Sequence, residues 1–219
     1  MDVVLRCRFQ LLWSVIEGVI RIIETEWLDS LPASDPRAEH SRRDLRRVNT
    51  LMGNARHIAN ALRPHWREGM RIADLGSGDG SLMRAVQARL PVEVIAVDKA
   101  DGLDVLDFLR QTGPRLDAIV CNLFLHHLDG DVLSDVLALA AERAPLFVAC
   151  EPRRARIALQ ASKMLWVLGA NDVTRHDAVV SVRAGFTGQE LSAIWPPGNW
   201  QFEERVAWPF THFFSAREG

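Results

Sequence analysis

Arg-Ile-Ala-Asp-Leu-Gly-Ser-Gly-Asp-Gly-Ser, residues 71–81, is the stretch from which the fold follows. Apolar residues lead into it, three glycines occupy its centre, and apolar residues at helical spacing follow from Leu82 to Val86. The pattern predicts a strand, a tight turn and a helix. Glycines let the backbone turn sharply and bring its N–H groups, at a helix start, close to a ligand. Such a turn is typical of a site for a nucleotide-like molecule.

The spacing of the glycines argues against a dinucleotide. A dinucleotide fingerprint has its third glycine at the sixth position, where this chain has Ser81, and the glycines here run Gly-x-Gly-x-Gly. Asp74, two residues before the first glycine, would repel a pyrophosphate but could hold an ammonium group through the backbone and water. We therefore expect a cationic ligand.

Asp74, Gly76, Gly78 and Gly80 match (Asp/Glu)-x-Gly-x-Gly-x-Gly, and the stretch thereby resembles the first motif of class I S-adenosylmethionine-dependent methyltransferases. The resemblance implies S-adenosyl-L-methionine (SAM) as cofactor and S-adenosyl-L-homocysteine (SAH) as its product, with Ser77 also in the cofactor loop. An ordinary glycine-rich turn in an α/β protein is the alternative.

A second strand, residues 92–98, ends in Asp98, about 20 residues beyond the glycines, where nucleotide-binding α/β units place an acid that accepts ribose hydrogen bonds. We expect Asp98 to bind the ribose. The methyltransferase resemblance implies the same role and puts Lys99 beside the adenosine. For Asp98, a turn former or helix cap is the alternative.

Only residues 99–115 separate Asp98 from the next strand, residues 116–122, where the family usually has a helix and a further strand. We therefore expect a fold shortened after its second strand. Asp104 and Val105 resemble the family's adenine-binding Asp-(Val/Ala) pair. Asp101 or Asp107 could fill this role if the register shifts, and exposure of these acids on a short helix is the alternative.

The third strand leads into Asn122-Leu123-Phe124-Leu125-His126-His127, and ligands of parallel sheets lie beyond the carboxyl ends of the strands. Many methyltransferases have a similar Leu-His-His here, so the resemblance places Asn122 and Leu123 at the cofactor and His126 at the substrate. We expect His127 to be a general base, since imidazole titrates near neutrality; a structural role is the alternative. The missing (Asp/Asn)-Pro-Pro-aromatic motif argues against methylation of nucleic-acid bases.

Two further catalytic candidates lie downstream. Glu151 follows the strand at residues 145–150 and reaches the same sheet edge, where it binds substrate or caps a helix. His176, the second candidate for the general base beside His127, lies in residues 173–186, a segment that the family often uses as a substrate lid. We expect the adjacent Asp177 to bond the backbone rather than to orient His176.

A helix expected at residues 41–53 has a strongly basic face. It resembles the family's helix over the cofactor pocket, which implies that Arg46 or Asn49 touches the methionine carboxylate or the substrate; a solvated face is the alternative. The tail predicts a helix at residues 189–195 and strands at 200–206 and 211–216. We expect an α/β, Rossmann-like fold: a mostly parallel sheet, helices on both faces and a C-terminal antiparallel strand pair.

The composition is that of one soluble domain: 219 residues, 48% hydrophobic, with a net charge of −2. Such a charge gives no field for nucleic acid or anionic membrane, so we expect a small-molecule acceptor and no nucleic-acid partner. Cys7, Cys121 and Cys150 read as reduced thiols of a cytoplasmic protein, the last two in buried strands.

Residues 1–40 are expected to form an N-terminal amphipathic helix and a linker, and residues 41–219 the methyltransferase domain. Apolar residues from Leu5 to Ile23 recur in steps of four and three, but Glu17 interrupts them, so we expect neither a signal peptide nor a transmembrane segment. The helix is compatible with docking on its own domain, a homodimer contact or a membrane-surface contact.

The expected activity is O- or C-methylation of a small phenolic or polyketide-like acceptor, without a metal site. The amino-acid sequence of residues 150–154 and 174–186 resembles that of bacterial methyltransferases of secondary metabolism that are encoded with type III polyketide synthases. A non-catalytic binding protein of the same fold is one alternative. An NAD(P)-dependent oxidoreductase is another, disfavoured by Asp74 and Ser81.

Overall fold

The computed structural model describes residues 19–32, 34–111 and 113–219. Most of the predicted N-terminal helix, with Cys7 and the contacts proposed for that helix, lies outside the described residues. Residues 19–26 form no helix, so the helix does not continue to Ile23 as expected.

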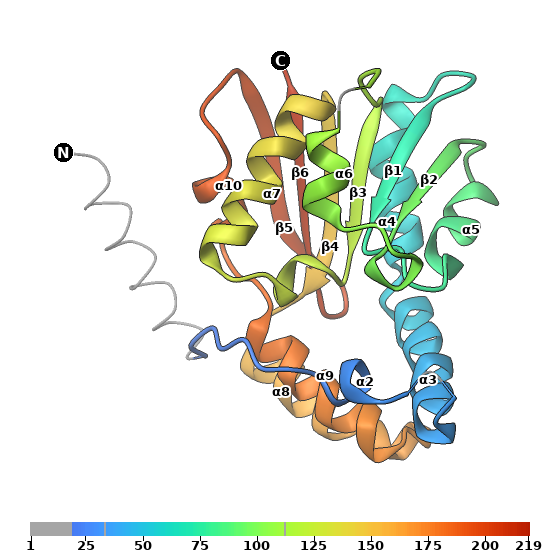
Figure 1. Cartoon of the computed structure of the whole chain (residues 1–219). Coiled ribbons are helices and arrows are strands. Elements are labelled where there is room, and N and C mark those ends of the chain that lie inside the picture. The colour runs from blue at the N-terminus through green and yellow to red at the C-terminus, as the bar shows by residue number, and fades with distance from the viewer. Residues whose placement is uncertain (1–18, 33, 112) are drawn as a thin grey trace.

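Within the described residues, six strands form one sheet in the order β2-β1-β3-β4-β6-β5 (Figure 1). The strands are β1 (Arg71–Leu75), β2 (Glu93–Val97), β3 (Ala118–Asn122), β4 (Leu146–Pro152), β5 (Trp200–Ala207) and β6 (Thr211–Glu218). Strands β1 to β4 are parallel, β6 is antiparallel to β4, and β5 is antiparallel to β6. The predicted mostly parallel sheet with a C-terminal antiparallel pair is confirmed.

Strand β2 lies at one edge of the sheet. Between β2 and β3 the described chain contains only the short helices η2 (Lys99–Asp101) and α6 (Val105–Arg110). The sheet is therefore shortened after its second strand, as the sequence predicted. A strand missing from the edge of a sheet removes only one strand pairing, because an edge strand has one neighbour, so the remaining strands stay paired.

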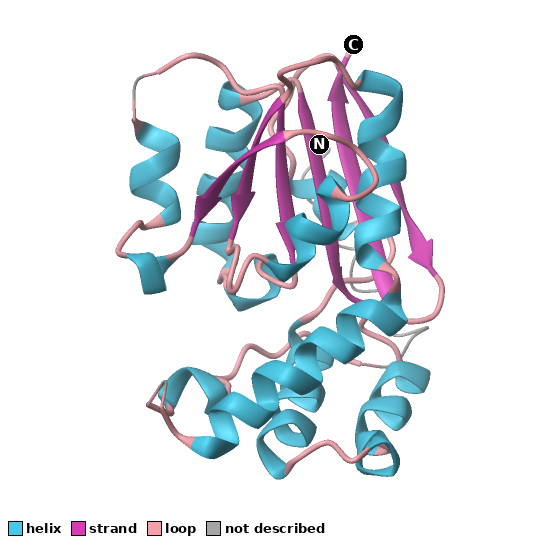
Figure 2. Cartoon of the chain, turned by 90° about the vertical axis from the view of Figure 1, so that its right-hand side faces the viewer, coloured by secondary structure: helices cyan, strands magenta, loops and turns pink. Residues whose placement is uncertain are grey.

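Alternate residues of the strands enter two separate cores, because side chains of a strand point to opposite faces. One core joins Leu75, Cys121 and Phe147 to α6, α7 (Gly130–Arg143) and α10 (Glu190–Ile194). The other joins Ile72 and Val148 to α4 (Asn54–Leu62) and α5 (Ser81–Gln87). Helices thus cover both faces of the sheet, as predicted (Figure 2).

A second, helical layer lies beyond the carboxyl ends of the parallel strands (Figure 1). It contains α2 (Trp27–Ser30), α3 (Pro36–Met52), α8 (Arg156–Lys163), η4 (Leu165–Leu168) and α9 (Asp172–Ala184). Helix α3 begins at Pro36 because Asp35 caps it, accepting a hydrogen bond from the Arg37 N–H, and it ends at Gly53 with φ 69°. Residue 41, the expected start of the methyltransferase domain, therefore lies inside this helix.

The remaining short helices connect these layers: η1 (Arg63–His65) follows α4, and η3 (Leu125–His127) follows β3. Cys121 and Cys150 are buried free thiols in β3 and β4, where the sequence placed them. None of the helices in the described ranges has the length and apolar character needed to cross a bilayer.

Candidate active site

A cavity of about 820 Å³ lies between the carboxyl ends of β1 and β3 and the helical layer. Its helical side is mostly apolar, lined by Leu45, Val48 and Met52 of α3, Ala158 of α8, and Met164 and Leu168 around η4. Its sheet side carries the glycine loop at one end and the two histidines of η3 at the other. The sequence-predicted motifs of β1 and β3 therefore meet in one cavity.

The glycine loop turns in the left-handed region at each glycine: φ is 70° at Gly76, 53° at Gly78 and 68° at Gly80. Only glycine adopts these angles without strain. Asp98 fastens the loop, since one of its carboxylate oxygens accepts a hydrogen bond from the Gly78 N–H at 2.8 Å and the other from the Ala100 N–H at 2.8 Å. The carboxylate predicted to bind ribose thus also holds the loop in shape.

Two polar groups of this end are buried. Burial raises the pKa of Asp74 to about 7, and the nearby negative charge of Asp98 adds to the increase. The hydroxyl of Ser77 is buried without a hydrogen-bond partner among the described residues. Both side chains line the cavity, so this end offers a carboxyl group and a hydroxyl group to a polar, positively charged ligand.

Helix α3 closes the cavity over the glycine loop. Arg46 donates a hydrogen bond from Nη1 to Oδ2 of Asp79, at 2.8 Å, and both residues line the cavity. Asn49 accepts a hydrogen bond from the Asn122 side chain at 3.2 Å, which connects α3 to the end of β3. The predicted positions of Arg46 and Asn49 over the pocket agree with this geometry, although their contacts with a ligand stay predictions.

Asn122 belongs to a chain of buried amides. Its Oδ1 accepts a hydrogen bond from Asn54 at 2.7 Å, and Asn54 in turn accepts one from the Thr211 hydroxyl at 2.7 Å. The chain runs from β6 through α4 to the cavity, and it fixes the Asn122 side chain. The next residue, Leu123, has φ 51°, a rare angle for leucine, and turns the backbone abruptly at the end of β3.

The residues predicted on the adenine side lie outside the cavity lining. Lys99 is exposed, and Asp104 caps α6 by accepting hydrogen bonds from the N–H groups of Leu106 and Asp107. The Val105 side chain is buried in the core beneath α6. The shortened connection thus leaves Ala100 as the lining residue from this segment, and the adenine contacts of Asp104 and Val105 stay predictions.

Glu151 organises the loop that carries the histidines. It is fully buried and accepts hydrogen bonds from the N–H groups of Phe124 (3.0 Å), Leu125 (2.9 Å) and His126 (3.4 Å). The first two groups bond to Oε1, whereas the His126 N–H bonds to Oε2, which also lies 2.8 Å from Nδ1 of the His126 ring. Glu151 thus holds η3 in place and lies outside the cavity lining, and its expected role toward a substrate stays a prediction.

Burial alone would lower the pKa of His126, but the hydrogen bond to Glu151 and the negative charges of Glu151 and Glu26 outweigh it and raise the pKa to about 9. His126 is therefore a buried cation near neutral pH. The neighbouring His127 is exposed and lines the cavity, and its ring centroid lies 4.1 Å from that of His126. Desolvation and the charge of His126 lower the pKa of His127, so this imidazole is neutral and able to accept a proton.

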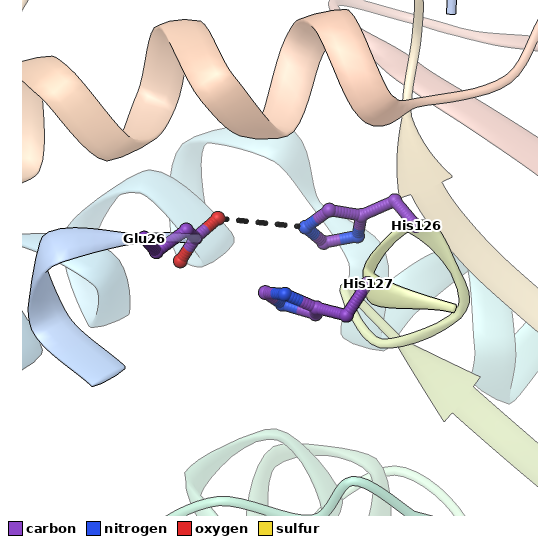
Figure 3. A group of neighbouring side chains, drawn as sticks. All are labelled: Glu26, His126 and His127. Atoms are coloured by element: carbon purple, nitrogen blue, oxygen red, sulfur yellow. Dashed lines mark ion pairs between the residues drawn. The ribbon is translucent and has the colours of Figure 1, made fainter. Parts of the chain in front are cut away.

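Glu26 is a site residue that the sequence did not reveal. Its Oε1 lies 3.7 Å from Nε2 of His126 (Figure 3). Glu26 also accepts a hydrogen bond from the Ser181 hydroxyl. It belongs to residues 19–30, which we call the N-terminal strap and which crosses the helical layer. The pattern of apolar residues in the strap does not identify Glu26 as a site residue, because contacts with residues distant in the sequence position it.

Those contacts are made by Asp177 and Arg21. Asp177 accepts hydrogen bonds from the N–H groups of Trp27 (2.8 Å) and Leu28 (3.0 Å). Arg21 donates to the carbonyl oxygens of Ala184 (2.8 Å) and Leu128 (3.1 Å). The prediction that Asp177 bonds the backbone is confirmed.

The expectation that His176 and Asp177 do not pair is wrong. Nδ1 of His176 lies 2.9 Å from Oδ1 of Asp177, because that carboxylate, fixed by the strap, lies beside the ring. The His176 ring stacks on Trp27 with 3.9 Å between centroids. His176 does not line the cavity, whereas a general base would have to face the acceptor there.

Comparison with known proteins establishes the fold. No protein-family model and no curated protein sequence matches this chain. A plantazolicin methyltransferase in complex with SAH superposes with a TM-score of 0.62 at 11% identity, over 85% of this chain and 92% of that one. Mitomycin 7-O-methyltransferase gives 0.55 at 17% identity, over 89% and 61% of the two chains. Human N-acetylserotonin methyltransferase in complex with SAM gives 0.50 at 17% identity, over 100% and 68%.

Proposed function

We propose that this protein is a SAM-dependent methyltransferase that transfers a methyl group to oxygen or carbon of a small, apolar acceptor. The observation that supports it best is a single cavity with a glycine cradle and a buried carboxylate at one end and a neutral imidazole at the other. The shared fold with structures that hold SAM or SAH agrees with the proposal.

The residues of the cradle fit this cofactor. Gly76 and Gly78 bring the backbone close, and Asp74 offers a carboxylate to an ammonium group. The Ser77 hydroxyl, which has no hydrogen-bond partner in the part of the chain that the structure describes, offers a donor and an acceptor. Asp98 would receive the ribose hydroxyls beside the loop that it fastens. Bound there, the cofactor supplies an electrophilic methyl group, so the chain's own work is to bind, align and remove a proton.

The walls favour an apolar acceptor. The cavity rim includes the exposed side chains of Leu51, Met164, Val167 and Leu168. Exposed apolar residues gathered at a cavity mouth suit an apolar ligand that covers them on binding. A phenolic or polyketide-like molecule has this character and carries the hydroxyl or activated carbon that methyl transfer needs.

Removal of the acceptor's proton falls to His127. It faces the cavity in the neutral form, whereas His126 already holds a proton and is fixed by Glu151. The cationic His126 lies beside the acceptor end, where it stabilises negative charge on an acceptor oxygen. The pair thus divides two tasks, proton removal and charge stabilisation.

Titration calorimetry with SAH, with NAD as the comparison ligand, tests the cofactor assignment. We expect micromolar binding of SAH alone, weakened at least tenfold in Asp98→Ala. Binding of NAD instead would favour the oxidoreductase alternative. Transfer of labelled methyl from SAM to a panel of phenols then tests catalysis, and SAH binding without transfer to any acceptor would favour a non-catalytic protein.

A further inference from the structure

Three side chains converge at the acceptor end of the cavity: Glu26 from the N-terminal strap, and His126 and His127 from η3 (Figure 3). One nitrogen or oxygen atom from each lies within 4.8 Å of the others. These residues come from segments far apart in the sequence, and all three line the cavity.

His126 is oriented as a metal ligand. Its Nδ1 is engaged by the buried Glu151 at 2.8 Å, which leaves Nε2 as the atom that points at Glu26. Nε2 is buried and has no hydrogen-bond partner within the described part of the chain, on a side chain that is 3% exposed. A carboxylate on the far nitrogen of a histidine is the usual arrangement around metal-binding imidazoles.

The spacing between His126 and Glu26 suits two ligands of one ion better than a direct contact. Nε2 and Oε1 are 3.7 Å apart, too far for a hydrogen bond. Two ligands that bind one ion at about 2.1 Å in tetrahedral geometry lie about 3.4 Å apart. A ring nitrogen of the exposed His127 lies within 4.8 Å of a ligand atom of both Glu26 and His126, and the open cavity leaves a position for a further ligand.

The local charge also favours a cation. The carboxylates of Glu26, Asp29 and Glu151 all act on the imidazole of His127, and Asp29 lines the cavity beside it. Arg21 also acts on Glu151, but its guanidinium is bonded to backbone carbonyls. An ion that displaces the Nε2 proton of His126 and lies between Glu26 and the two rings would therefore be in a negative environment.

We propose that Glu26, His126 and His127 form a binding site for a divalent transition-metal ion of the Zn²⁺ class, with Glu151 orienting His126. Two imidazoles and one carboxylate favour Zn²⁺, Co²⁺ or Fe²⁺ over Mg²⁺ and Ca²⁺, which prefer oxygen ligands. The sequence predicted no metal site, because Glu26 joins the histidines only in the folded protein. The site does not depend on methyl transfer; with a metal bound, His127 is a ligand and the ion faces the acceptor.

Calorimetric titration of the chelator-treated full chain with Zn²⁺, and with Mg²⁺ for comparison, tests the site. Three variants are compared with the wild type: Glu26→Gln, His127→Ala and, as the matched control, His65→Ala, which removes an exposed histidine on η1. Circular dichroism checks that each is folded. Titration with Co²⁺ adds a spectroscopic signature, because its visible absorption reports imidazole ligands in tetrahedral geometry.

We expect one Zn²⁺ per chain in the wild type and in His65→Ala, weak or no binding of Mg²⁺, and affinity for Zn²⁺ at least tenfold lower in Glu26→Gln and in His127→Ala. Visible Co²⁺ bands should be lost in the same two variants. The site is ruled out if the wild type binds no Zn²⁺, or if Glu26→Gln and His127→Ala bind it as the wild type does. Because no cofactor or acceptor is present, neither result depends on methyl transfer.

Discussion

A Cβ atom on Gly76 would lie 2.4 Å from Cδ2 of Phe124, so the ring of Phe124 fills the space that any other residue would need. The glycine motif of β1 and the loop after β3 are therefore in direct contact. The cofactor end and the acceptor end of the cavity share this contact, and each depends on the position of the other.

Gly76→Ala tests this contact. We expect it to lower the free energy of unfolding by about 3 kcal/mol, since the new methyl group collides with the ring at a left-handed backbone position. Gly78→Ala is the matched control: its φ is 53°, but nothing lies within 4 Å, so only about 1 kcal/mol of backbone strain is expected. Urea denaturation measures both, and equal losses would show that Phe124 is not the cause.

Binding of SAH should depend on pH through Asp74. The pKa of this buried carboxyl is about 7, and a ligand with an ammonium group favours the ionised form. Affinity for SAH should therefore rise several-fold between pH 6 and pH 8. Calorimetry at both values measures the change, and Asp74→Asn should bind weakly and equally at the two; a wild type without pH dependence would contradict the role of Asp74.

Asp74→Asn should also stabilise the ligand-free protein above pH 7. The pKa of Asp74 rises from 3.8 to about 7 on folding, so the folded state loses stability as pH rises through this window. The neutral amide avoids that loss, which is on the order of 2 to 4 kcal/mol. Urea denaturation at pH 8 and pH 5 should show a larger gain at pH 8, and an equal effect at both would refute the buried charge.

Glu151→Gln should destabilise the protein by about 3 kcal/mol. The amide of glutamine places an N–H₂ group against donors, whereas Glu151 accepts from three backbone N–H groups and from His126. The comparison variant is Glu203→Gln, because Glu203 is exposed and its ion-pair partner within the described residues is Arg205, and it should change stability by less than about 1 kcal/mol. Thermal and urea unfolding measure both.

His127→Ala should keep SAH affinity within about twofold of the wild type but lower turnover at least about 100-fold, because it removes the proton acceptor at the cavity. His176 stacks on Trp27 and does not line the cavity, so His176→Ala should keep most of the wild-type turnover. Methyl transfer from labelled SAM measures both. Equal losses in the two variants would show that the cavity position of His127 is not decisive.

The sheet and the glycine loop could be predicted from sequence because their signals are local. Residues 71–81 specify the strand, turn and helix by themselves, and alternating apolar residues mark the other strands. The shortening of the fold after Asp98 could be predicted because only residues 99–115 separate Asp98 from the next strand. By contrast, Glu26 is held at the cavity by the Ser181 hydroxyl and by the bonds of its neighbours Trp27 and Leu28 to Asp177, and no local pattern encodes such contacts.

The roles of the acidic and histidine candidates also depended on distant partners. Glu151 was correctly placed at the sheet edge, but sequence alone left open whether it binds a substrate or caps a helix, and it did not predict the bonds to the backbone of residues 124–126. His176 was predicted in the lid segment, and α9 does cover the cavity. Its ring faces Trp27 instead, because the strap occupies that side of the helix.

The strap also sets an order for synthesis. Trp27 and Leu28 leave the ribosome early, yet the Asp177 carboxylate that anchors them follows 150 residues later. At 5–20 residues per second, the interval is roughly 8 to 30 s. The nascent chain therefore carries its glycine loop well before Glu26 can dock beside the histidines, and the acceptor end of the cavity is completed only when α9 has been made.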